Sequence, residues 1–269
     1  RRPVVAGVAV AAVLAGAGAA AATDWLQIFR TERIAPVSLS TADLNAVPDL
    51  EDYGEVVVSG DPDVHEVADA AAAAAETDLD VPEAASLPRG VSGEPTYQVG
   101  GEVSVTFTYS EDEAARTAAE AEQPLPPAPP GVDGSRVRLV AGPGVAAIWA
   151  ESVGGPDLVV GRALAPRAFS DSGVPFEALR DHLLSLPGLP EDVAASLRAF
   201  GTEGSTLPLP VPTEHVTTSS AEVDGVPATV FATRDRSLAA VTWVEDGVMT
   251  VVAGPLDADE VLAVAGSLR

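Results

Sequence analysis

The chain contains neither cysteine nor lysine, and only 4% of its residues are aromatic. Without cysteine there is no disulfide framework, thiolate nucleophile, cysteine zinc site or lipidated cysteine. Without lysine there is no Schiff-base chemistry and no P-loop. These absences remove several classes of enzyme and leave few side chains with obvious reactivity.

Positive charge is also scarce, because 15 basic residues face 40 acidic ones and the formal net charge is −25. A nucleic-acid-binding surface needs cationic side chains that displace counterions from phosphates. DNA and RNA are therefore excluded as expected partners. The same acidity favours solubility and mutual repulsion between copies of the chain.

Residues 3–22 form an uncharged run rich in alanine, valine and glycine. At about 1.5 Å per helical residue, this run can span a membrane as a transmembrane helix. Arg1 and Arg2 precede it and Trp25 follows, so the positive-inside rule predicts a single-pass anchor with the rest of the chain outside the cytoplasm. Residues 1–24 are the predicted anchor, and a bacterial cell membrane is the expected location.

Two other interpretations of this run stay open. Small residues before Asp24 would suit cleavage of a signal peptide, although the run is longer than the usual hydrophobic region of such a peptide. A buried alanine-rich helix of a globular domain is the third interpretation, and the even distribution of apolar residues argues against it.

The exported part divides into three predicted regions. Residues 25–60 are expected to be a juxtamembrane segment with solvated arginines, ending in a first strand at 55–58. Residues 61–131 are expected to form an α/β region, in which Asp61 caps a helix that runs to Thr77. Its second half is predicted as a β-hairpin, a helix opened by Ser110, and a proline-rich connector at 123–131. The hairpin pairs 96–99 with 102–109 around two glycines, which can adopt the backbone of a tight turn.

Residues 132–269 show a weak internal duplication. Val132-Asp133-Gly134 and Val223-Asp224-Gly225 each precede three apolar segments and a helical segment. We therefore predict an α+β fold with an N-terminal transmembrane helix followed by antiparallel β-sheets with packed helices, including two related βββα units. In the second unit, Asp246-Gly247 has the composition of a two-residue hairpin turn, and Asp257 is the expected cap of the last helix.

No residue can be assigned to catalysis, to a cofactor or to a metal. His65, His182 and His215 each lie near carboxylates, but their spacing matches no metal-binding or catalytic motif. The acidic residues at 61–69 do not fit a calcium loop, and a solvated helix N-terminus explains them better. Trp149 and Trp243 occupy equivalent places in the two units, and we expect them to anchor the core.

The C-terminal segment from Ala221 to Arg269 contains VDGVPATVFA, AVTWVEDGVMTVVAG and DADEVLAVAGSL. It resembles the uncharacterised extracytoplasmic domain found in many bacterial membrane-anchored proteins, including anti-sigma factors, and residues 81–91 extend this similarity loosely. The resemblance implies a cytoplasmic part before the membrane span and an outer domain that senses or binds something. No residue of the present sequence can be given a sigma-binding role.

These observations predict a non-enzymatic membrane protein whose outer domain is a sensory or protein-interaction module, with a protein partner in the membrane or envelope. Two alternatives remain open. One is a module that binds a lipid or another apolar molecule in the concavity of a curved sheet, with no specific small molecule indicated. The other is an envelope hydrolase that uses a carboxylate pair distant in sequence.

Overall fold

The computed structural model describes residues 25–150, 155–199 and 205–269. The predicted α+β class with antiparallel sheets and packed helices is confirmed. None of the helices in these ranges is long and apolar enough to cross a membrane. The predicted anchor at 3–22 lies outside the described residues.

Two antiparallel sheets make up most of the structure. The five-stranded sheet has, in spatial order, the strands β1 (Leu26–Arg30), β10 (Arg167–Ser170), β7 (Arg136–Ala141), β6 (Val103–Tyr109) and β3 (Gly54–Ser59). The eight-stranded sheet has the strands β12 (Val216–Val223), β13 (Val226–Thr233), β14 (Ala239–Glu245), β15 (Val248–Gly254), β9 (Leu158–Leu164), β8 (Gly144–Trp149), β5 (Thr96–Gly100) and β4 (His65–Val67).

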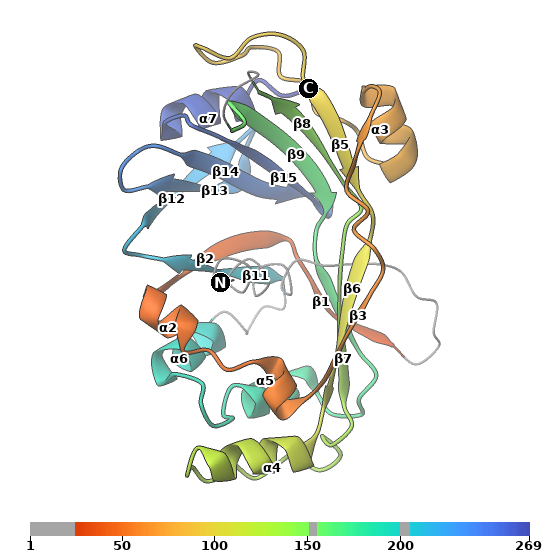
Figure 1. Ribbon diagram of the computed structural model, residues 1–269, viewed down its shortest axis with the longest axis vertical. Helices are drawn as coiled ribbons and strands as arrows, with labels where there is room; N and C mark the ends of the chain where they lie inside the picture. Colours follow the sequence, from red (N-terminus) through yellow and green to blue (C-terminus); the bar gives the residue numbers. More distant parts are fainter. Residues whose placement is uncertain (1–24, 151–154, 200–204) are drawn as a thin grey trace.

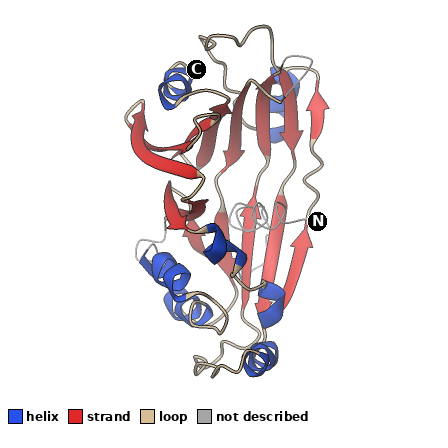
Figure 2. Cartoon of the chain, turned by 60° about the vertical axis from the view of Figure 1, so that its left-hand side comes forward, coloured by secondary structure: helices blue, strands red, loops and turns tan. Residues whose placement is uncertain are grey.

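The two sheets continue into one another end to end. Four neighbouring strands of the five-stranded sheet are each joined along the chain to one strand of the eight-stranded sheet. The joined pairs are β10 with β9, β7 with β8, β6 with β5, and β3 with β4, and the two sets have the same spatial order. Figure 2 shows the strands of the two sheets running on from one another along the length of the molecule. The chain therefore builds a single long sheet that bends where its strands pass from one part to the other (Figure 1).

Glycines occupy this bend because other residues would not fit. Gly60 has a φ of +89°, and a Cβ atom added there would lie 2.4 Å from the carbonyl oxygen of Glu102. Gly142 has a φ of +79°, and its Cβ would lie 2.8 Å from the carbonyl oxygen of Gly101. Positive φ and such close approach of backbones both require glycine. Glycine is therefore required at two of the places where the chain passes between the sheets, before β4 and before β8.

The bend also explains why the predicted hairpin at 96–109 is wrong. Both strands form, but β5 pairs with β4 and β8, whereas β6 pairs with β3 and β7. The pair Gly100-Gly101 lets the chain pass between sheets instead of turning back. A glycine pair permits either path, and the choice depends on partners distant in sequence.

The predicted first βββα unit does not form one sheet, for the same reason. β7 lies in the five-stranded sheet, while β8 and β9 lie in the eight-stranded sheet. The second predicted unit is continuous, since β13, β14 and β15 are neighbours. Asp246 and Gly247 have φ values of 50° and 81°, which makes the predicted primed turn between β14 and β15 correct.

Two further local predictions need correction. The segment at 61–69 includes strand β4, and the helix α3 (Ala70–Thr77) begins after Asp69, whose side chain caps it, instead of after Asp61. The first strands come earlier than 55–58, because residues 25–35 form β1 and the start of β2 (Arg33–Leu39), on which Arg30 and Arg33 are exposed as predicted. Thr31 between these strands is fully buried and donates a hydrogen bond from Oγ1 to the carbonyl oxygen of Pro166 at 2.7 Å.

Seven further elements complete the fold. β2 pairs in parallel with β11 (Thr206–Pro212), and this ribbon packs against β13 and β14. The remaining elements are α2 (Thr41–Asn45), the short helix η1 (Leu50–Tyr53), α4 (Glu111–Glu120), α5 (Phe176–Leu183), α6 (Glu191–Ala199) and α7 (Ala258–Ala265). Figure 1 shows α7 on one side of the eight-stranded sheet and the β2–β11 ribbon on the other, with α2 and α6 beyond the ribbon.

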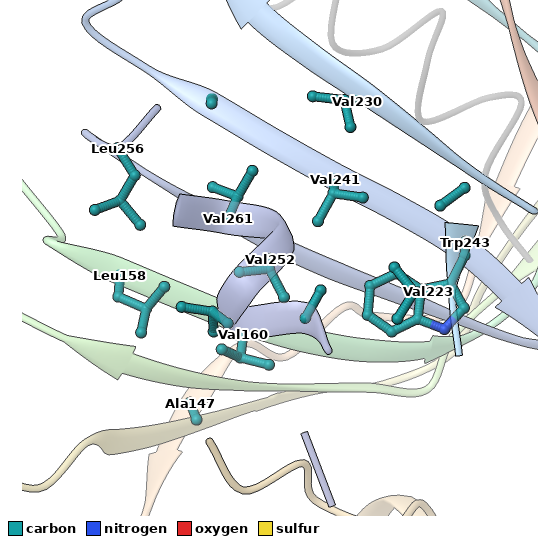
Figure 3. Close-up of a cluster of buried hydrophobic side chains, with 14 of the residues drawn as sticks. Ala147, Leu158, Val160, Val223, Val230, Val241, Trp243, Val252, Leu256 and Val261 are labelled. Carbon is teal, nitrogen blue, oxygen red and sulfur yellow. The ribbon is translucent and has the colours of Figure 1, made fainter. Parts of the chain in front are cut away.

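The largest hydrophobic core lies between α7 and the eight-stranded sheet. Asp257 and Glu260 form the predicted capping box at the start of α7. Val261, Val264 and Ala265 of this helix are buried against strands β8, β9, β13, β14 and β15 (Figure 3). The last helix is therefore positioned both by its cap and by its apolar stripe.

Candidate functional site

The three histidines lie in separate parts of the fold and do not form one site. His65 on β4 contacts the carbonyl oxygen of Asp63 through Nδ1 at 2.7 Å, and its Nε2 lies 3.0 Å from the Glu76 carboxylate. His215 lies in the turn between β11 and β12, and His182 lies in α5. Within the described ranges, no group of three or more histidine, aspartate or glutamate side chains is arranged to hold a metal ion.

His182 is buried and packs against Tyr109 of the five-stranded sheet. Its Nε2 lies 3.0 Å from the hydroxyl oxygen of Tyr109, and the two rings meet edge to face. Burial lowers the pKa of His182 and raises the pKa of Tyr109 to about 12. Both side chains are therefore neutral near pH 7, which suits a structural hydrogen bond within the core.

Neutral burial of His182 predicts a pH dependence of stability. In the folded chain the pKa of His182 lies below the ordinary value of 6.5. At pH values between the folded and the ordinary pKa, the unfolded chain therefore binds more protons than the folded chain. The free energy of unfolding should therefore fall as the pH drops below about 6.5. Above that pH, His182 should make no pH-dependent contribution to the free energy of unfolding. Urea unfolding at several pH values, compared with His182→Gln, measures this slope.

His65 provides the matched control for this measurement. Its side chain is 40% exposed, and the Asp63 carbonyl together with Glu76 raises its pKa. The stability it contributes is present at low pH and is lost as pH rises through the raised pKa, so His65→Gln should change the slope slightly in the opposite direction. A slope unchanged in His182→Gln would contradict a neutral buried His182.

Among the described residues, the carboxyl groups with displaced pKa values, Asp43, Glu214 and Asp235, are displaced downward. Hydrogen bonds from Thr233 and Ser237 lower the pKa of Asp235 to about 2. The pKa values of Asp43 and Glu214 are also lowered, chiefly by hydrogen bonds from Ser40 and from the backbone of Glu214, respectively. Each of these groups is ionised at neutral pH, so none is suited to give a proton to a leaving group.

Trp149 and Trp243 belong to the packed core, as predicted. Each is 6% exposed, and both contact the cluster that α7 covers. Figure 3 shows Trp243 among Val223, Val252 and the other apolar side chains of this cluster. In the described part of the chain, protein side chains therefore fill the space between the two tryptophans and α7.

On β8, β9 and β15, the opposite face of the eight-stranded sheet is apolar and half-buried. Successive side chains of a strand point to opposite faces, so residues that alternate with the buried core residues lie together on the side away from α7. We call this surface the inner face and define it by the half-buried residues Ala146, Ile148, Val159, Gly161, Ala163, Val251 and Ala253. It extends over β8, β9 and β15.

The strand register joins these residues into rows. Ile148 lies opposite Val159, and Val159 lies opposite Ala253. In the next row, Gly161 lies between Ala146 and Val251. On β8, β9 and β15 every side chain in these rows is small or aliphatic, and Thr96 and Gln98 of β5 continue the two rows with polar side chains.

Neighbouring strands of this face are covered by the β2–β11 ribbon. Thr229 on β13 is buried and donates a hydrogen bond from Oγ1 to the carbonyl oxygen of Ile34 on β2 at 3.1 Å. Thr242 on β14 lies opposite Thr229 and is also buried. The inner face thus begins where the ribbon's cover ends.

Cavities lined by described residues lie elsewhere on the structure, and three of them are well defined. One, of about 430 Å³, lies between the start of α7 and the ends of β12, β13 and β14, where Arg234 and Arg236 line it. Another, of about 360 Å³, separates α7 from the segment around Leu87. A third, of about 250 Å³, lies at the bend of the long sheet. The sequence reasoning found none of them, because each combines residues from distant segments.

Comparison with protein-family models, with curated proteins and with solved structures finds no match. The assignment of a function to this chain therefore depends on its own surfaces.

Proposed function

We propose that this chain is the non-enzymatic binding domain of a single-pass bacterial membrane protein, held outside the cytoplasm by the predicted helix at 3–22. Its inner face would bind an apolar segment of a partner protein in the membrane or envelope. The observation that supports this proposal most directly is the difference between the two faces of the eight-stranded sheet. One face is filled by α7 and its core, while the other presents aliphatic side chains that remain half-buried.

An apolar surface of this kind favours a partner over a hydrophilic ligand. Apolar side chains that stay half-buried still have surface left to cover, and covering it with a partner is favourable. The small side chains of Ala146, Gly161 and Ala163 let a partner backbone approach the sheet closely. An extended or helical apolar segment fits such a surface better than a polar metabolite does.

Binding at this face would act through a population shift. A partner that prefers one arrangement of the sheet and the β2–β11 ribbon stabilises that arrangement in proportion to its difference in affinity. The predicted membrane tether then localises or transmits the change. The resemblance of residues 221–269 to the outer domains of anti-sigma factors supports a signalling role of this type.

Site-specific photocrosslinking in native membranes tests the proposal. A photoreactive phenylalanine analogue replaces Ile148 on the inner face, and the control replaces Val57, which is 42% exposed on β3 of the other sheet. We expect a discrete protein adduct from position 148 that is absent or much weaker from position 57. Equal adducts from both positions, or none from position 148, would contradict partner binding at the inner face.

A second function is supported by the same surface. The inner face is apolar enough to hold a lipid chain, although the filled core around Trp243 removes the tryptophan-lined pocket that would have favoured a lipid carrier. Mass spectrometry of the adducts distinguishes the two functions. A lipid adduct at position 148 without a protein adduct would favour lipid binding over the proposed partner.

A further inference from the structure

Two arginines lie side by side at the bend of the long sheet. Arg30 on β1 and Arg167 on β10 are directly opposite one another in the antiparallel register. Within the described ranges, neither makes an ion pair with a carboxylate. Like charges in directly opposed positions of a sheet are destabilising. In a chain with a net charge of −25, an unneutralised pair of cations is an unexpected feature.

Arg167 is also left with an unsatisfied donor. Its Nε atom is buried and has no hydrogen-bond partner among the described residues. A buried donor without a partner loses its hydrogen bonds to water and forms none with the protein, which destabilises the folded state. The neighbouring arginines of the same sheet differ, since Arg136 pairs with Asp171 and Arg138 donates from Nε to Oγ1 of Thr106.

A cavity opens beside this pair. It has a volume of about 250 Å³ and is lined by both arginines together with Gln27, Leu164, Asp246 and Gly247. Gly247 lets Arg30 lie against the turn between β14 and β15, since a Cβ atom there would be only 2.8 Å from Nη2 of Arg30. Two guanidinium groups, an amide side chain and one carboxylate therefore surround a space that is open to solvent.

We propose that this cavity binds a phosphate group between Arg30 and Arg167. Guanidinium groups form paired hydrogen bonds with oxyanions, and a bound anion relieves the repulsion between the two cations. A phosphate has enough oxygen atoms to contact two separate guanidinium groups, whereas a carboxylate has only two. The donor of Arg167 that has no partner is the group that such an anion would satisfy.

The single acid of the cavity does not neutralise the pair. Asp246 makes no ion pair with Arg30 or Arg167 in the described part of the chain, and its side chain belongs to the turn at the rim. The formal charge of the lining is therefore +1, from two arginines and one aspartate. We expect Asp246 to limit affinity for multiply charged anions and to favour a phosphate that carries one or two charges.

The test uses residues 25–269 and the variants Arg30→Gln and Arg167→Gln. Glutamine retains polarity but removes the charge, and Arg30 lies on an edge strand, where substitution is least disruptive to folding. Arg116→Gln is the matched control, since this exposed arginine lies on α4 and pairs with Glu113. The full chain in detergent is measured in parallel, and circular dichroism verifies that each variant folds at either length.

Binding is measured by calorimetry with inorganic phosphate, with acetate, and with vesicles of phosphatidylglycerol or phosphatidylcholine. We expect phosphate or phosphatidylglycerol to bind at least about tenfold more weakly to each cavity variant than to the unaltered chain, with Arg116→Gln unchanged. Binding of free phosphate identifies a soluble source, and binding of the vesicles alone identifies a lipid headgroup. Both results support the site.

Three results would overturn it. These are no binding of phosphate or of either vesicle, equal binding by the cavity variants, and acetate binding as tightly as phosphate. If Arg167→Gln fails to fold, Arg30→Gln decides the outcome. None of these results depends on whether a partner binds the inner face, so this test is independent of the photocrosslinking experiment.

Discussion

Replacing Gly60 by alanine is expected to destabilise the domain more than any other single methyl addition at the bend. The φ of +89° costs an L-residue about 1–2 kcal/mol. The added Cβ would also lie 2.4 Å from the carbonyl oxygen of Glu102, a backbone atom that cannot rotate away. The displacement of β6 that this requires adds about 1–3 kcal/mol, by analogy with overpacking. Urea unfolding measures the total.

Gly90→Ala is the matched control for the bend. Gly90 has almost the same φ, +90°, but no atom lies within 4 Å of its added Cβ. It should therefore show only the conformational cost, and the difference between the two variants isolates the close approach of the two chain segments. Equal destabilisation by both variants would show that the segments at the bend are farther apart than described.

Trp243→Ala is expected to cost about 3–5 kcal/mol, the range found for large aromatic side chains removed from a packed core. Trp243 is 6% exposed and lies under α7 with Val241, Val252 and Val261 nearby (Figure 3). The neighbours are held by strands and by a capped helix, so they cannot collapse fully into the space. Thermal and urea unfolding should both report the loss.

Leu238→Ala is the control for this core substitution. Leu238 is 52% exposed in the loop before β14, so its truncation should change the free energy of unfolding by less than about 0.5 kcal/mol. A loss below about 1 kcal/mol for Trp243→Ala would contradict a packed environment for this tryptophan. It would also restore the alternative that Trp243 lines a ligand groove.

Features that depend on residues close together in the chain could be predicted from the sequence. The turn at Asp246-Gly247, the cap at Asp257 and the apolar stripe of α7 involve residues within about one helical turn of each other, and all three predictions are confirmed. In the same way, Ser110 caps α4, as its spacing to Glu113 predicts. Local hydrogen bonds and side-chain periodicity determine such features, so the sequence specifies them directly.

The predictions that failed concern strand partners. The sequence from Thr96 to Tyr109 indicates two strands around Gly100-Gly101, and both exist, but their partners are in different sheets. Nothing within that segment distinguishes a turn from a passage between sheets, because glycine permits both. The choice is made by contacts with β3, β7 and β8, which the segment itself does not contain.

The candidate sites depend on the same long-range contacts. The inner face combines alternate residues of β8, β9 and β15. The cavity at the bend depends on the pairing of Arg30 with Arg167, which are far apart in the sequence and belong to no common motif. The alternation of side chains along β15 indicates that the strand has two distinct faces. It does not indicate which of the two faces α7 covers. For this reason neither site could be predicted from spacing.

The sequence by itself determined the α+β class, the turn at Asp246-Gly247 and the caps at Ser110 and Asp257, because these follow from neighbouring residues. Only the tertiary structure decided that two sheets form one bent sheet, that its inner face stays half-buried and that two arginines meet at the bend. The physical reason is that sheet pairing satisfies backbone hydrogen bonds between distant segments, and many pairings satisfy them equally well until the whole core is packed.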